Sequence, residues 1–201
     1  MKVQPAACFA AHQRAGYHCH NMATTRQVLE TTIDLEKQSM ALYARFAKIF
    51  ASNPKLRDFW FGMARDEARH VGALDLVETV LDMEGKLDAD SPVSLDDAII
   101  GKLRGLLGKY RRDDAMPRTI ERALAIAVEV EETELEDMVA DLLRAVQSPD
   151  EYERCMRLLV HDLGELSYMI EQHSQDAALQ ERCDALVNRH AESLRANTAT
   201  R

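Results

Sequence analysis

Hydrophobic side chains recur at helical spacing through most of this chain, and the clearest run lies between Leu56 and Met83. Taken in steps of three and four, its positions form one continuous stripe of the kind that a bundle helix buries. The members of the stripe are Trp60, Met63, Glu67, His70, Leu74, Val77 and Leu81. Glu67 and His70 are metal-ligand side chains, and they lie one helical turn apart. We therefore expect a buried helix that carries an inward Glu-x-x-His unit.

Three further long helices are predicted by the same pattern. They run from about Thr24 to Ala51, from about Pro117 to Val146, and from Pro149 to about His173. Carboxylates interrupt the apolar stripe of each of these helices. These are Glu36 in the first, Glu131 and Glu134 in the second, and Asp162 and Glu165 in the third. Asn53–Pro54 and Ser148–Pro149 are helix-start signals that follow closely on helix ends, so the long helices should form two antiparallel hairpins.

The two hairpins are joined by a connection from about Gly85 to Met116, which contains one short amphipathic helix. A connection of this length can return the chain along the bundle, as in bundles with one long crossover. The predicted fold class is therefore all-α, a four-helix bundle of two antiparallel hairpins with one long crossover and a C-terminal helix. Residues 1–21 are interpreted as a disordered tail or as a stretch before the true start at Met22; residues 22–173 form the bundle, and residues 174–201 form the last helix and tail.

Composition and charge narrow the function classes. A net charge of -9 disfavours nucleic acid or an anionic membrane as the main partner. No apolar run approaches the roughly 18 residues that cross a bilayer. The cysteines are Cys8, Cys19, Cys155 and Cys183, and they form no C-x-x-C pair. This pattern fits a reducing compartment, so a cytoplasmic protein is expected.

The interrupting carboxylates repeat along the chain. Glu36 and Glu67 are 31 residues apart, and so are Glu131 and Asp162, so the two hairpins should place acids at the same level of one core. Burying all six acids without compensation costs on the order of tens of kcal/mol, more than the roughly 5–15 kcal/mol that stabilise a domain. Two bound metal ions would offset this cost, and oxygen-rich ligation with one imidazole suits iron or manganese.

A plain bundle is the competing interpretation, in which the inner glutamates pair with arginines of neighbouring helices or face solvent. His161 lies one residue off the stripe, and it is interpreted as a surface or supporting residue rather than a ligand. Tyr43 lies one heptad after Glu36, and it is either ordinary core or a phenol near the metals.

Residues 24–173 resemble the di-iron domain of rubrerythrins in the ferritin-like superfamily. The matching motifs are Ile33-Asp34-Leu35-Glu36 with Tyr43, Asp66-Glu67-Ala68-Arg69-His70, and Val128-Glu129-Val130-Glu131 with Glu134. The resemblance implies a non-haem di-iron centre, with manganese or zinc possible at one or both positions. The implied metal ligands are Glu36, Glu67, His70, Glu131, Glu134, Asp162 and Glu165, and the implied catalytic residues are Tyr43 and Glu134.

The resemblance also implies a homodimer that reduces hydrogen peroxide. Asp162 and Glu165 stand where the family usually repeats Glu-x-x-His, and Val139 is closest to the place of its second tyrosine. No paired C-x-x-C motif of a rubredoxin domain is present, so electrons should come from a separate donor such as a rubredoxin. The alternatives are a ferritin-type protein that oxidises ferrous iron with dioxygen, and a metal-free interaction bundle.

Overall fold

The computed structural model describes residues 23–91, 95, 97–133, 135–144 and 148–199, and these form an all-helical protein. The expected N-terminal tail, residues 1–21, lies outside the described residues. Within the described part, the one β-type pairing is an isolated bridge between Thr24 and Asp90. None of the described helices is long and apolar enough to cross a membrane.

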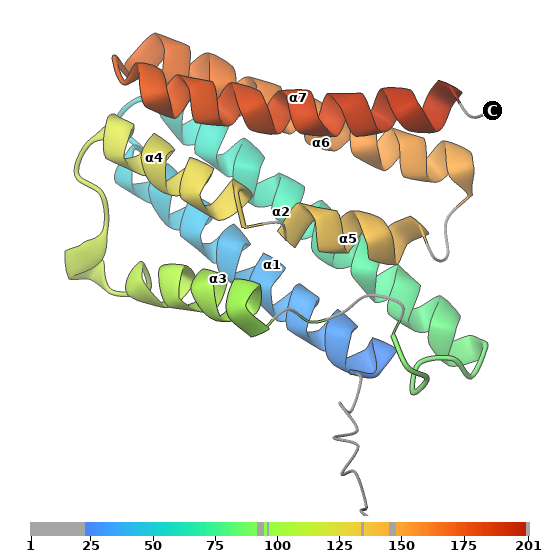
Figure 1. The fold of residues 1–201 in the computed structure, drawn as a ribbon. Coiled ribbons are helices and arrows are strands. Elements are labelled where there is room, and N and C mark those ends of the chain that lie inside the picture. Colours follow the sequence, from blue (N-terminus) through green and yellow to red (C-terminus); the bar gives the residue numbers. More distant parts are fainter. Residues whose placement is uncertain (1–22, 92–94, 96, 134, 145–147, 200–201) are drawn as a thin grey trace, which may run out of the picture.

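The first hairpin consists of α1 (Thr25–Ile49) and α2 (Pro54–Met83), which lie side by side and antiparallel (Figure 1). α1 begins with a reciprocal capping box between Thr24 and Gln27, as the sequence predicts. The side chain of Asn53 accepts hydrogen bonds from the first backbone N–H groups of α2. Because the turn between the helices is short, the inward faces of α1 and α2 are held opposite each other.

The predicted crossover contains α3 (Asp97–Lys109) and a 3₁₀ turn, η1 (Asp113–Ala115). α3 packs across α1, and the chain then returns to the end of the bundle where α4 begins. Arg45 of α1 donates hydrogen bonds to the Tyr110 carbonyl at 2.6 Å and to Asp113 at 2.5 Å, and these bonds tie the end of the crossover to the first hairpin.

The third long helix is not continuous, and here the prediction from the sequence is wrong. The structure has α4 (Ile120–Glu131) and α5 (Leu135–Arg144) in its place. At the end of α4 the N–H of Glu132 still bonds to the Val128 carbonyl four residues back, whereas the N–H of Thr133 bonds to the Val130 carbonyl only three residues back. The Thr133 hydroxyl also donates to the Val130 carbonyl at 2.6 Å. A short polar side chain that bonds the local backbone competes with helix continuation, which explains a break at this point.

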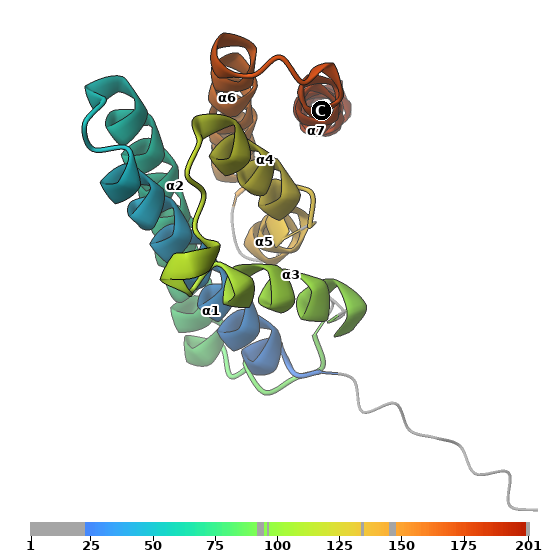
Figure 2. The ribbon, with the colours of Figure 1, turned by 90° about the vertical axis from the view of Figure 1, so that its left-hand side faces the viewer.

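The second hairpin is completed by α6 (Pro149–His173), which lies beside α4 and α5. Ser148 and Glu151 form the predicted capping box at its start. The predicted C-terminal helix is α7 (Ala177–Ala199), which covers the outer side of α6 (Figure 2). Leu179, Cys183 and Leu186 of α7 are buried against this side, so α7 stabilises the position of α6.

Candidate metal centre

α1 and α2 bring the first three predicted ligands together. Glu36 points inward from α1 and is fully buried, while Glu67 and His70 extend from adjacent turns of α2. The Nδ1 atom of His70 lies 3.6 Å from Oε2 of Glu36 and 3.4 Å from Oε2 of Glu67. One potential ligand atom from each of the three residues lies within 4.8 Å of the others.

These distances and this donor set fit a bound metal ion. Ligand atoms at about 2.0–2.2 Å from one ion lie roughly 3.0–3.5 Å from one another in octahedral or tetrahedral geometry. The separations from the imidazole to the two carboxylates are close to this range. Two carboxylates and one imidazole are also a donor set that binds divalent transition metals.

Burial raises the free energy of these carboxylates when they are ionised and no cation is bound. Burial raises the pKa of Glu67 well above its ordinary value, and the neighbouring charge of Glu36 raises it further. The hydrogen bond with His70 acts in the opposite direction. A cation at this position would remove the repulsion between the carboxylates, because it interacts favourably with each of them.

Glu131 is the last residue of α4, and it lies near the same group. Its side chain is buried, and the Tyr43 hydroxyl donates to its Oε1 at 2.6 Å. Burial and the charge of Glu67 raise the pKa of Glu131 to about 8, although the Tyr43 hydrogen bond lowers it. Tyr43 itself stacks on Trp60, with ring centroids 6.0 Å apart. Tyr43 is therefore a buried core residue whose hydroxyl also contacts one of the buried acids.

Asp162 of α6 completes the set that the structure brings together. It lines one small cavity with Glu67, His70 and Glu131. Its side chain is 16% exposed, so it lies nearer to the surface than the glutamates. The cavity is thus bounded by α2, α4 and α6, which come from both hairpins.

Among the described residues, the predicted ligand Glu165 does not join this set. Glu165 has a side chain that is 61% exposed and lies 3.9 Å from His161, so the structure does not bring it to the cavity. His161 is itself 65% exposed and contacts Asp162 through Nδ1 at 3.1 Å, which agrees with a surface or supporting role. Glu134 lies outside the described residues.

Asp66 and Arg69 also belong to this site, although the stripe pattern did not select them. Asp66 lines the cavity, and burial together with the charge of Asp162 raises its pKa. Arg69 pairs with Asp66 and lies 3.9 Å from Asp162. One signal in the sequence could have identified Asp66 and Arg69, namely that they directly neighbour Glu67 and His70. A residue at the edge of a buried helix face can still reach a cavity.

The Tyr43–Glu131 hydrogen bond can be tested by removing the hydroxyl alone. Tyr43→Phe should lower the free energy of unfolding by about 1–3 kcal/mol, because a buried acceptor loses its donor while the ring is kept. It should also raise the pKa of Glu131, since this bond lowers it. Urea denaturation measures the first effect. Tyr168→Phe is the matched control, because Tyr168 is 59% exposed on α6. Equal stabilities of the two variants would contradict a structural role for this bond.

Comparison of the chain with models of known protein families, with curated proteins and with solved structures found no match. The resemblance to rubrerythrins therefore stays a prediction from the quoted motifs, and function has to be argued from the site.

Proposed function

We propose that this protein is a non-haem di-iron oxidoreductase of the ferritin-like kind that reduces hydrogen peroxide with electrons from a separate donor protein. The observation that carries the proposal is the convergence of Glu36, Glu67 and His70 with Glu131 and Asp162 in one interior. Two antiparallel hairpins joined by a long crossover are consistent with a ferritin-like bundle.

The donor set is compatible with the iron of this proposal. Carboxylates with one imidazole suit iron or manganese, and an all-protein site rich in thiolates would suit zinc or copper(I) better. Iron bound by these residues supplies the electrons for the reaction. Glu36, Glu67 and His70 are proposed to hold one position, and Glu131 and Asp162 are proposed to contribute to the second.

The protein must also supply protons, because hydrogen peroxide takes up two electrons and two protons to give two molecules of water. Burial and the charge of Glu67 raise the pKa of Glu131 to about 8 in the metal-free protein, so its carboxyl group would give up its proton when it binds the metal. Tyr43 donates to Oε1 of the same carboxyl group, which fixes its orientation. The Tyr43 hydroxyl, which lies beside this candidate ligand, is proposed to pass protons to the peroxide.

Rapid mixing tests the proposed reaction. The iron-loaded, reduced protein should be oxidised faster by hydrogen peroxide than by dissolved oxygen at equal concentration, and turnover should stop after one cycle without an added donor. Glu36→Gln should lose the reaction, whereas Glu165→Gln should keep it, because Glu165 is exposed and outside the cavity. Faster oxidation by dioxygen, with mineral growth on added ferrous iron, would support the iron-handling alternative instead.

The outer face of α2 supports the expected homodimer. Phe61, Leu76 and Met83 are 63%, 58% and 84% exposed on this helix. Phe61 and Met83 are placed symmetrically about Gly72, and so are Ala68 and Leu76. A Cβ atom at Gly72 would meet nothing within 4 Å, so packing within the chain does not require a glycine there. We propose that two copies of α2 cross antiparallel at Gly72, because a face with this symmetry can complement itself.

Substitution on this face should change the oligomeric state. Leu76→Glu is expected to convert a dimer into a monomer, since the charge would be buried against the second copy. Light scattering coupled to size-exclusion chromatography measures the mass. Tyr168→Glu replaces a comparably exposed residue on α6 and should leave the mass unchanged. A dimer that survives Leu76→Glu would show that another surface is used.

A further inference from the structure

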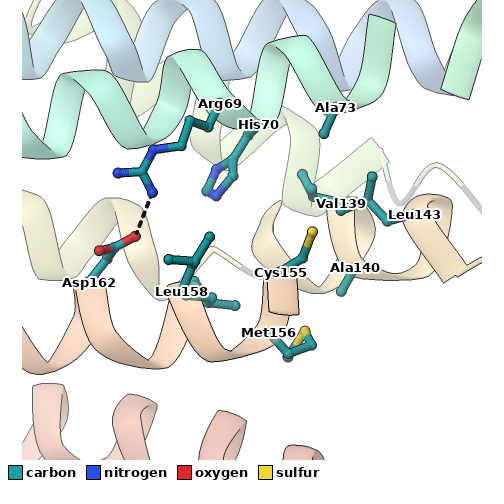
Figure 3. A pocket seen from close by; sticks show the side chains of 11 residues that line it. Arg69, His70, Ala73, Val139, Ala140, Leu143, Cys155, Met156, Leu158 and Asp162 are labelled. Atoms are coloured by element: carbon teal, nitrogen blue, oxygen red, sulfur yellow. Dashed lines mark ion pairs between the residues drawn. The ribbon is translucent and has the colours of Figure 1, made fainter. Parts of the chain in front are cut away.

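Of the three residues in the candidate metal-binding group, His70 is the one that solvent reaches. Its side chain is 21% exposed, whereas those of Glu36 and Glu67 are 0% and 5% exposed. His70 lines a second cavity, the outer cavity, which lies between α2, α5 and α6 (Figure 3). The outer cavity is therefore a route from the surface to this group.

The outer cavity adjoins the inner cavity, which is the small cavity at the candidate metal centre. His70, Leu159 and Asp162 line both cavities. Leu158 is 48% exposed and lines the outer cavity but not the inner one, so it marks the mouth. A molecule that enters from solvent thus meets Leu158 first and Leu159 next, on its way to the buried acids.

The sizes of the two cavities suit small molecules. The outer cavity has a volume of about 70 Å³, and the inner cavity has a volume of about 20 Å³. A cavity needs about 10–15 Å³ to hold one water molecule, so hydrogen peroxide, which is little larger than water, fits the outer cavity. Sites for larger organic ligands typically measure about 300–1,000 Å³, so a hydroperoxide that carries a phenyl ring is too large.

Two features limit the width of this route. Arg69 extends from α2 towards Asp162 of α6, with 3.9 Å between their charged groups, and crosses the space beside His70 (Figure 3). The remaining walls are largely apolar, with Val139 and Leu143 of α5 among them. Side chains packed at the density of a protein interior have little room to move apart, so a larger molecule would have to displace them.

We infer that the outer cavity is the passage by which hydrogen peroxide reaches the candidate metal centre, and that this passage excludes organic hydroperoxides. Entry into the cavity does not depend on a bound metal ion. The use of the peroxide at the centre rests on the proposed function.

A thiol placed at either end of the passage reports which molecules pass through it. In a Cys155→Ala background, Leu158→Cys introduces a thiol at the mouth, and Leu159→Cys introduces one where the two cavities meet. The thiolate sulfur takes the terminal oxygen of a hydroperoxide as the O–O bond breaks, which gives a sulfenic acid and releases hydroxide or an alkoxide. The metal-free variants are treated with hydrogen peroxide or with cumene hydroperoxide. Trapping with dimedone and peptide mass spectrometry then measure the sulfenic acid at each position.

Both oxidants should react with the thiol of the Leu158→Cys variant. In the Leu159→Cys variant, the rate with hydrogen peroxide relative to the rate with cumene hydroperoxide should be about tenfold higher or more than at the mouth, because the larger molecule does not fit. The same comparison in urea is the control, and there the two positions should give equal ratios. Equal ratios in the folded protein overturn the inference.

Narrowing the passage should slow the reaction at its inner end. Ala73 lines the outer cavity but not the inner one, so Ala73→Phe should slow oxidation of the Leu159→Cys variant by hydrogen peroxide about tenfold or more. Ala185→Phe, on the exposed side of α7, should leave the rate unchanged. If Ala73→Phe fails to fold, as judged by circular dichroism, Ala73→Leu takes its place. An unchanged rate in the folded Ala73 variant contradicts the passage.

Iron content and oxidation of the iron-loaded, reduced protein keep the two proposals apart. Hydrogen peroxide should oxidise this protein about tenfold faster or more than cumene hydroperoxide does. Size-selective oxidation of the introduced thiols in a protein that takes up no iron would support the passage and contradict the di-iron function. Iron uptake and rapid oxidation by hydrogen peroxide, with equal ratios at the two thiols, would support the di-iron function and contradict the passage.

Discussion

Removal of bound metal by a chelator is expected to lower the melting temperature by about 5–10 °C. A ligand present at a hundred times its dissociation constant stabilises the folded state by about 2.7 kcal/mol, and in a domain of this size each kcal/mol shifts the melting temperature by roughly 2–4 °C. The physical reason is the burial of Glu36 and Glu67, which a cation compensates only in the folded state.

Two variants separate this effect from non-specific binding. Glu67→Gln should take up less metal and lose the chelator-dependent shift. Glu165→Gln should keep the metal content and the chelator-dependent shift, since the side chain of Glu165 is 61% exposed. Differential scanning calorimetry with metal analysis measures both quantities. An unchanged melting curve after verified metal removal would argue against a buried ligand cluster.

The metal-free protein is expected to lose stability as the pH rises from about 5 to 8. The pKa of Glu131 is about 8 in the folded state, against an ordinary value of 4.5, so unfolding releases a proton throughout this interval. The free energy of unfolding then falls by about 1.4 kcal/mol per pH unit for each such group. The raised pKa of Glu67 acts in the same direction, and so does that of His161 above its ordinary 6.5.

Urea denaturation at several pH values measures this dependence. Glu131→Gln should flatten the slope, because the amide does not titrate, and saturating metal should flatten it as well. Glu171→Gln is the matched control and should leave the slope as it is, because Glu171 is exposed on α6. A metal-free protein whose stability increases between pH 5 and 8, or a Glu131→Gln variant with the original slope, would contradict the burial of this acid.

Local signals in the sequence are sufficient for most of the helical architecture. The caps at Thr24, Asn53 and Ser148 mark helix starts that the structure reproduces. Such caps act through hydrogen bonds within four residues, so they can be identified without knowledge of the fold. The break between Glu131 and Leu135 escaped prediction, because the apolar stripe continues through it while the backbone bonds of Thr133 end α4.

The inward position of the candidate ligands also follows from helical periodicity. Glu36, Glu67 and Glu131 occupy stripe positions, and all three are buried. Periodicity fixes the direction of a side chain around its helix, but it does not fix how deeply the helix is buried at that level. Asp162 and Glu165 both lie on the stripe of α6, yet the first lines the cavity and the second faces solvent.

The tertiary structure decided the contacts between residues that are distant in the sequence. Tyr43 reaches Glu131 across 88 positions, and Arg69 of α2 lies 3.9 Å from Asp162 of α6. The pKa of Glu131 depends on this neighbourhood, because it is set by burial and by the charge of Glu67 on another helix. By itself, the sequence determined which side chains share one face of a helix, since that depends on spacing along one helix. Only the packing of α2, α4, α5 and α6 decided which of them meet, because the helices supply these side chains from separate parts of the chain.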